Sequence, residues 1–202
     1  MDLRTSIRTC TSCPLHETRV NATPADVGTN YRPQGLAFLA GFPGDLEDKS
    51  GVPMAVGAAR YGIPVGVLFN QALEMAGISR SDVLVMNRVR CKPPRNRVGD
   101  FPEATVNCDP WNVAELAKHA PALVVLLGGT TVTGVFGAKA KVTQMRGVFR
   151  STSDKHVWGK RLWTATFDPA AAGRAPELLL EIADDMKRAL AVWKEANVLP
   201  TS

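Results

Sequence analysis

The sequence predicts an α/β domain in which a mainly parallel sheet of four strands is covered by helices on both faces. Four short apolar segments of strand length are spread along the chain, and segments with helical spacing of apolar residues alternate with them. Strands that alternate with helices form βαβ units, whose parallel sheets are buried on both faces. A chain of 202 residues fits a single domain over residues 1–202.

The first two predicted elements stand on either side of a long polar loop. Residues 1–35 contain many loop formers and show no clear period. Residues 36–40 (LAFLA) are the first predicted strand, and the tight turn of residues 41–44 ends it. After an acidic loop, apolar residues recur at helical spacing from 65 to 76, and Gly77 closes this helix.

The middle of the chain predicts a second strand, a basic loop and a second helix. Residues 82–89 (DVLVMNRV) form the strand, and the loop of residues 91–101 is rich in proline and arginine. Asp109 and Pro110 then predict a helix to about residue 119, with Asp109 as N-cap and Pro110 in its first turn.

Two more strands complete the predicted sheet. Residues 122–127 (ALVVLL) form the third, and the Gly-Gly-Thr-Thr segment after it leads into a short helix. Residues 162–167 form the fourth, which ends at Asp168-Pro169, and residues 176–196 predict a long amphipathic helix. Sites in such sheets form at the carboxyl ends of the strands, so we expect the residues that follow each strand to converge.

Composition limits the class of protein. Hydrophobic residues make up 45% of the chain, but no apolar run approaches the roughly eighteen residues of a membrane span, and the N-terminus has no apolar stretch typical of a signal peptide. We therefore expect a cytoplasmic protein, associated with the nucleoid or made in a virus-infected cell. We also expect a monomer, because the sequence shows no coiled-coil heptads. The net charge of +5 favours a polyanionic partner such as nucleic acid.

The four cysteines indicate a metal site. Cys10 and Cys13 form a C-x-x-C pair, whereas Cys91 and Cys108 stand apart with sixteen residues between them. A zinc ribbon would have a second C-x-x-C pair, which is missing here. Inside a cell thiols stay reduced, so metal binding is favoured over disulfides. Four thiolates bind either tetrahedral zinc or an iron–sulfur cluster, and the spacing leaves both open.

Several motifs in a fixed order resemble those of one enzyme family. The N-terminal segment CTSCPL, the loop PGDLEDKSGVP and the segment NRVRCKPPRNR resemble motifs of the iron–sulfur uracil-DNA glycosylases (families 4 and 5). Glu103 and Cys108 follow at the expected distance, and Leu126-Leu127-Gly128 resembles the next strand and glycine of that family. The resemblance runs from about residue 10 to 170.

The resemblance implies a cofactor, a fold and a partner. The cofactor is a structural [4Fe-4S] cluster on Cys10, Cys13, Cys91 and Cys108, the fold is a three-layer α/β/α domain, and the partner is DNA in base excision repair. The cluster would hold a basic loop near the phosphates, although a solvated charge run is the alternative interpretation. The candidate DNA-binding residues are Arg88, Arg90, Lys92, Arg95 and Arg97.

The resemblance also implies a pocket for a base flipped out of the duplex. Asn87 matches the base-recognising asparagine of the family, and an amide offers both a donor and an acceptor to uracil or thymine. An asparagine that only hydrogen-bonds its own loop is the alternative. The other candidate substrate-binding residues are Gly41, Phe42, Pro43, Gly44 and Met54.

The sequence departs from the family at the positions that carry chemistry. Gly41 stands where the family usually has a carboxylate, while Asp45 matches a second acidic position. Met54 or its neighbour replaces the stacking aromatic, for which Phe42 is an alternative surface. Asp168 replaces the histidine that stabilises the departing base, and an ionised aspartate would repel that anion.

The three histidines of the chain lie outside the family's histidine motif. They are His16, His119 and His156, and of these only His156, in the loop before the last strand, could reach the site.

These observations favour a DNA glycosylase that hydrolyses the N-glycosidic bond of uracil or a modified pyrimidine. Asn87 would recognise the base, and Asp45 or Asp168 would activate water. Asp168 could also pair with a cationic group on an unusual base. The alternative is an inactive member that binds DNA or a modified base without cleavage. A redox protein is disfavoured, since the sequence resembles no flavin or electron-partner site.

Overall fold

The sheet of the protein has six strands in the order β1-β3-β2-β4-β6-β5. The computed structural model describes residues 2–58 and 62–198. Four parallel strands form its centre, and a two-residue antiparallel strand lies at each edge. The strands are β1 (Asp26–Val27), β2 (Leu36–Ala40), β3 (Leu84–Asn87), β4 (Leu123–Leu127), β5 (Arg150–Ser151) and β6 (Leu162–Thr166). The predicted α/β class is confirmed, and the strand number is corrected from four to six.

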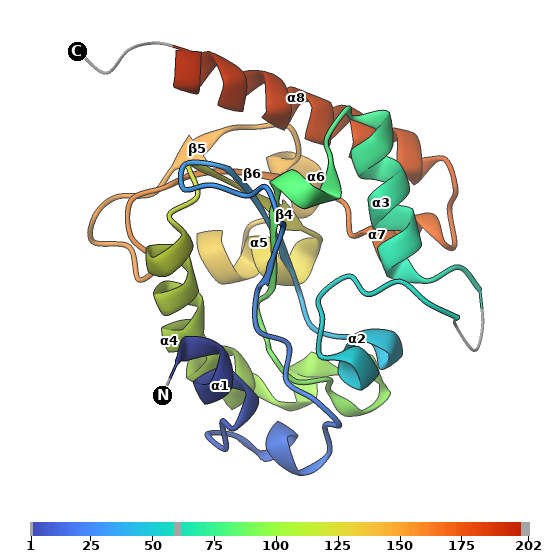
Figure 1. The fold of residues 1–202 in the computed structure, drawn as a ribbon, viewed down its shortest axis with the longest axis vertical. Helices are drawn as coiled ribbons and strands as arrows, with labels where there is room; N and C mark the ends of the chain where they lie inside the picture. The colour runs from blue at the N-terminus through green and yellow to red at the C-terminus, as the bar shows by residue number, and fades with distance from the viewer. Residues whose placement is uncertain (1, 59–61, 199–202) are drawn as a thin grey trace.

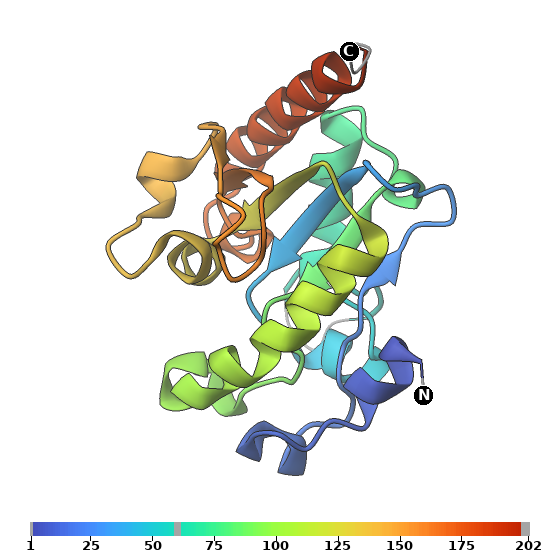
Figure 2. The ribbon, with the colours of Figure 1, turned by 90° about the vertical axis from the view of Figure 1, so that its left-hand side faces the viewer.

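Helices cover both faces of this sheet (Figure 1, Figure 2). The α-helices are α1 (Leu3–Arg8), α2 (Asp45–Ser50), α3 (Val65–Met75), α4 (Pro102–His119), α5 (Gly129–Phe136), α6 (Val142–Met145), α7 (Pro169–Ala172) and α8 (Leu178–Val198). Short 3-10 helices are η1 (Pro14–Glu17), η2 (Arg80–Asp82), η3 (Pro94–Asn96) and η4 (Val98–Asp100). Among the described residues, no helix is both long and apolar enough to cross a bilayer.

Alternate residues of each central strand enter two different hydrophobic cores. Phe38 of β2 packs with residues of α3 and α8, whereas its neighbour Leu39 packs with Leu116 of α4 and Val132 of α5. Successive side chains of a strand point to opposite faces, so an almost wholly apolar strand requires cover on both sides. This explains why LAFLA and LVVLL were recognisable as strands from sequence.

The largest differences from the predicted elements lie at α4 and α2. The helix expected to start at Asp109 begins at Pro102, and Pro110 lies inside it. Pro102 occupies the first turn, where a missing N–H costs nothing, and Pro110 is on the exposed side of the helix. The acidic segment after Gly44, expected to be a loop, is helix α2, and Gly51 ends it with a positive φ of 67°.

Candidate active site

Asn87 ends β3 at the carboxyl edge of the sheet and is fully buried. Its Nδ2 donates to Thr23 Oγ1 at 3.1 Å and to Glu47 Oε1 at 3.4 Å. Its Oδ1 is also buried, yet it has no hydrogen-bond partner in the part of the chain that the structure describes. A buried acceptor without a donor costs stability, and such atoms are rare in proteins unless an ordered water molecule or a ligand donates to them.

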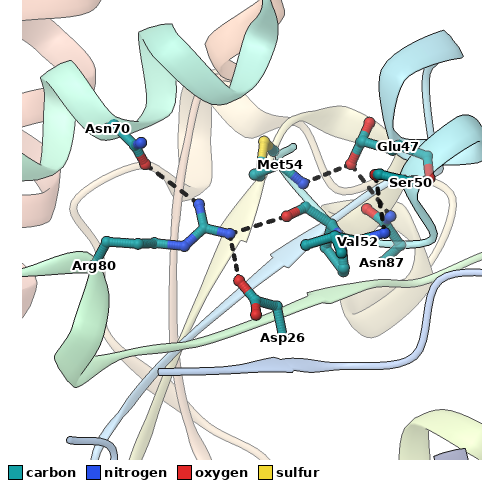
Figure 3. A network of polar contacts seen from close by, with 9 residues as sticks. Asp26, Glu47, Ser50, Val52, Met54, Asn70, Arg80 and Asn87 are labelled. Atoms are coloured by element: carbon teal, nitrogen blue, oxygen red, sulfur yellow. Dashed lines mark hydrogen bonds and ion pairs between the residues drawn. The ribbon is translucent and has the colours of Figure 1, made fainter. Parts of the chain in front are cut away.

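Glu47 is the carboxylate that faces Asn87 (Figure 3). It lies in the first turn of α2 and is 3% exposed. The N–H of Gly44 donates to Oε2 and the N–H of Met54 to Oε1, each at 2.7 Å. Burial raises the pKa of Glu47, while these N–H donors and Asn87 oppose the rise. The side chain is therefore fixed by two backbone donors and by Asn87.

Sequence reasoning missed Glu47 because it placed the acid of this loop at Asp45. The side chain of Asp45 is 77% exposed and pairs with Lys92 Nζ at 3.1 Å, so it points to solvent rather than toward Asn87. The predicted catalytic role of Asp45 has no support in this geometry. The Gly44-x-x-Glu47 spacing was the available signal, since a glutamate three residues after an N-cap folds back onto the helix start.

Asp168 follows β6 and lies at the same edge of the sheet. Its Oδ1 accepts from the N–H of Ala170 at 2.9 Å, which caps the short helix α7. A Cβ at Gly128 would stand 2.9 Å from the Asp168 Cβ, so glycine is needed for this close approach. Burial raises the pKa of Asp168, and its charge in turn contributes to the raised pKa of Glu47. The structure thus places two carboxyl groups with raised pKa values at the carboxyl edge of the sheet.

The cysteines form a second centre beside this site. All four of them, with Arg19, Arg90 and Trp111, line one cavity. Arg19 Nη1 donates to Cys91 Sγ at 3.0 Å, and burial raises the pKa of Cys108 to about 11. Among the described residues, no three Cys, His, Asp or Glu side chains are arranged around a single metal ion. Four soft donors around one cavity fit a polynuclear thiolate-bound group.

Comparison with known proteins identifies the family. Residues 32–194 match the family model described as Uracil DNA glycosylase superfamily. The Type-4 uracil-DNA glycosylase of Thermotoga maritima is 32% identical over 192 residues, which cover 94% of this chain and 92% of that protein. The chain belongs to the uracil-DNA glycosylase superfamily. The Type-4 uracil-DNA glycosylase of Archaeoglobus fulgidus is 31% identical, over 93% of this chain and 89% of that protein.

In this superfamily member, the two candidate stacking side chains pack into apolar clusters. Met54 is 3% exposed and packs in the core with Phe38 and Phe69, at a positive φ of 50°. Phe42 is half-buried and packs against the apolar cluster around Cys91. Met54 therefore offers almost no exposed surface to a base in this structure, whereas Phe42 is partly exposed. Gly41, Pro43 and Gly44 lie in the segment directly after β2, and their role in substrate binding stays a prediction.

His156 does not supply the missing histidine of this superfamily member. Its Nε2 donates to the carbonyl of Val135 at 2.9 Å, and its Nδ1 accepts from the N–H of Trp158 at 3.2 Å. Both ring nitrogens are thus used in holding its own loop to α5. The hypothesis that His156 reaches the site is not supported by these contacts.

The predicted basic loop is divided between interior and surface. Arg90 is 1% exposed and forms an ion pair with Glu115 at 2.6 Å, so it cannot touch phosphates in this structure, and its predicted DNA contact is corrected. Arg88 is partly buried and donates to the carbonyl of Thr130 at 3.1 Å. Only Arg95 and Arg97 of the predicted set are exposed, while Lys92 is partly exposed and pairs with Asp45.

Proposed function

We propose that this protein is a DNA N-glycosylase that hydrolyses the bond between deoxyribose and uracil or a modified pyrimidine flipped out of DNA. The observation that carries the proposal is the buried, unpartnered Oδ1 of Asn87 beside the Glu47 carboxylate. The names of the Type-4 relatives support it.

In this proposal each polar group of the site has a role. Asn87 Oδ1 accepts the N3–H of a pyrimidine, a donor that uracil has and cytosine lacks. Glu47 positions a water molecule and takes its proton while the water oxygen bonds to C1′. The C1′–N1 bond breaks, and its electron pair leaves with the base. This assignment moves the water-activating role from Asp45 to Glu47.

Asp168 acts on the departing base in this proposal. Burial raises its pKa and so favours the neutral acid. A neutral carboxylic acid donates a hydrogen bond to a developing anion, whereas a carboxylate would repel it. The replacement of the family's histidine by Asp168 is then compatible with catalysis.

The four cysteines would hold a [4Fe-4S] cluster, and Lys92, Arg95 and Arg97 would contact the DNA backbone. The cluster, when bound, supplies a structural cross-link between the N-terminal segment, the segment after β3 and α4. Phosphate contacts by the exposed loop would make DNA binding strongly salt-dependent. We expect the purified protein to be brown and to contain iron, and to elute as a monomer in gel filtration. We also expect the protein to be located inside the cell, with the DNA.

A glycosylase assay tests this function. The holoprotein is incubated with oligonucleotides that contain uracil, hydroxymethyluracil or another modified pyrimidine, and abasic sites are cleaved with alkali. We expect product from at least one base and a loss of about 10²–10⁴-fold in Glu47→Gln. Product formed equally well by Glu47→Gln would contradict the assignment of Glu47.

A second candidate function is recognition of a modified base without cleavage. One observation favours it, since both hydrogens of the Asn87 amide are already directed to Thr23 and Glu47. A pyrimidine would then meet an acceptor but no amide donor. Tight binding of one oligonucleotide, with no abasic product from any of them, would support this function instead.

A further inference from the structure

Arg80 is hydrogen-bonded to the loop that carries Met54, on the side opposite Glu47 (Figure 3). It lies in η2, and its side chain is 26% exposed. Its Nη2 donates to the carbonyl oxygen of Pro53 at 2.9 Å and pairs with Asp26 at 2.7 Å. Its Nη1 donates to Asn70 at 3.3 Å, and the guanidinium lies over the Phe69 ring, 5.1 Å from the centroid. Contacts from β1, α3 and the loop thus fix Arg80.

The carbonyl of Pro53 and the N–H of Met54 belong to one peptide group. Arg80 binds the oxygen of this group and Glu47 binds its nitrogen, so a cation and a carboxylate stand at opposite ends of one amide dipole. A cation at the carbonyl polarises the amide, and its N–H then becomes a stronger donor. The stronger donor stabilises the ionised form of the acceptor.

We propose that Arg80 is a positioning residue for this active site, which acts through the Pro53–Met54 peptide to orient Glu47 and keep its carboxylate ionised. The inference rests on the proposed function, in which Glu47 activates water. Arg80 touches neither Glu47 nor Asn87 directly in the contacts above, so its effect passes through the backbone. The positive φ of Met54 strains the backbone of this loop. The hydrogen bonds of the Pro53–Met54 peptide to Arg80 and Glu47 offset this strain.

Charged groups other than Arg80 also affect the ionisation of Glu47, and the test must separate their effects from that of Arg80. Asp168, at the end of β6, acts in the opposite direction once it ionises, because its negative charge disfavours the carboxylate form of Glu47. Of the remaining charges on α2, Asp45 pairs with Lys92, Asp48 accepts from the N–H groups of Val20 and Asn21, and Lys49 is exposed. Asp26 neutralises Arg80 on its far side.

The test measures the ionisation of Glu47 without requiring activity. The Met54 amide proton of the isotope-labelled holoprotein is followed by NMR against pH, because its shift reports the charge of the carboxylate it donates to. In Arg80→Met the midpoint should rise by about one pH unit relative to the natural protein. Arg80→Gln serves the same purpose if the Met variant does not fold, and Arg80→Lys should restore most of the effect through its charge.

The matched control is Arg188→Met on the exposed side of α8, which removes an arginine without touching the loop. An unchanged Met54 midpoint in Arg80→Met or Arg80→Gln would overturn the inference, as would an equal rise in Arg80→Lys or in the control.

Kinetics give the second readout. The acid limb of kcat/KM should move upward with the NMR midpoint, whereas a merely structural loss would lower the rate at every pH alike. If the titration midpoint of the Met54 amide moves in the Arg80 variants but the natural protein cleaves no base, the proposed function is refuted. The effect of Arg80 on the ionisation of Glu47 is then still supported. Full activity with an unmoved midpoint would refute the role of Arg80 alone.

Discussion

At the residue scale, the site depends on which of several neighbouring carboxylates turns inward. Asp45 and Glu47 lie two residues apart in an acidic segment, and composition alone does not separate them. The structure separates them by burial, with Asp45 paired at the surface and Glu47 held by two backbone N–H groups. Asn87 was predictable because it ends a recognisable strand, whereas the inward turn of Glu47 depends on α2, which was not predicted.

This difference predicts opposite outcomes for two conservative changes. Asp45→Asn should alter kcat less than about threefold, because a surface ion pair contributes little. Glu47→Gln should keep KM and lower kcat by about 10²–10⁴-fold, since a positioned base is lost. Steady-state kinetics on a uracil oligonucleotide distinguish them, and the reverse ranking would restore Asp45 as the base.

The two carboxyl groups with raised pKa values also predict a bell-shaped pH dependence. Glu47 must be ionised, so kcat/KM should rise as pH increases through its raised pKa. Asp168 must be protonated, so kcat/KM should fall as pH increases through the raised pKa of that group. The two limbs are properties of the pair rather than of either residue alone. Asp168→Asn keeps a neutral donor and should remove the alkaline limb, and a profile that retains this limb would contradict the role of Asp168.

At the element scale, apolar strands were predictable and short polar helices were not. The four central strands are recognisable in the sequence because burial on both faces requires uninterrupted apolar residues. Helix α2 has only six residues and is stabilised by tertiary contacts, among them Asp48, which accepts from the N–H of Val20 at 3.0 Å. The start of α4 at Pro102 was not predicted, because Asp109-Pro110 has the residue pattern of a helix N-terminus although it lies inside the helix.

The buried pair of Arg90 and Glu115 predicts a large stability effect at this scale. Glu115 also accepts from the N–H of Ala25 at 2.7 Å, and Arg90 donates to Asn112 on α4 at 2.7 Å. Glu115→Ala should lower the free energy of unfolding by about 3–5 kcal/mol, because it leaves a buried guanidinium unpaired. Urea denaturation measures this, and Asp100→Ala, which breaks the exposed pair with Arg97, should cost about 0–1 kcal/mol.

At the scale of the whole molecule, the cysteine centre joins segments that are distant in sequence. Cys10 and Cys13 come from the N-terminal segment, Cys91 follows β3, and Cys108 lies in α4, whereas the sheet has its own two cores. The apolar cluster around the cysteines is small and includes Ile7 and Leu15 from the N-terminal segment. Sequence predicted this joining through resemblance, since spacing alone left zinc and iron open.

Loss of this centre should therefore loosen one end of the molecule and leave the sheet folded. The double variant Cys10→Ser, Cys13→Ser should be colourless and be cut by protease within about its first twenty residues. It should keep most of its far-UV circular dichroism, because the central strands pack in two cores distinct from the cluster around the cysteines. Its DNA affinity should fall, since the segment after β3 would lose its cross-link to the N-terminal segment. Natural protein that is itself colourless and contains one zinc per chain would refute the cluster, while a variant that loses its whole far-UV signal would show that the centre holds the entire fold.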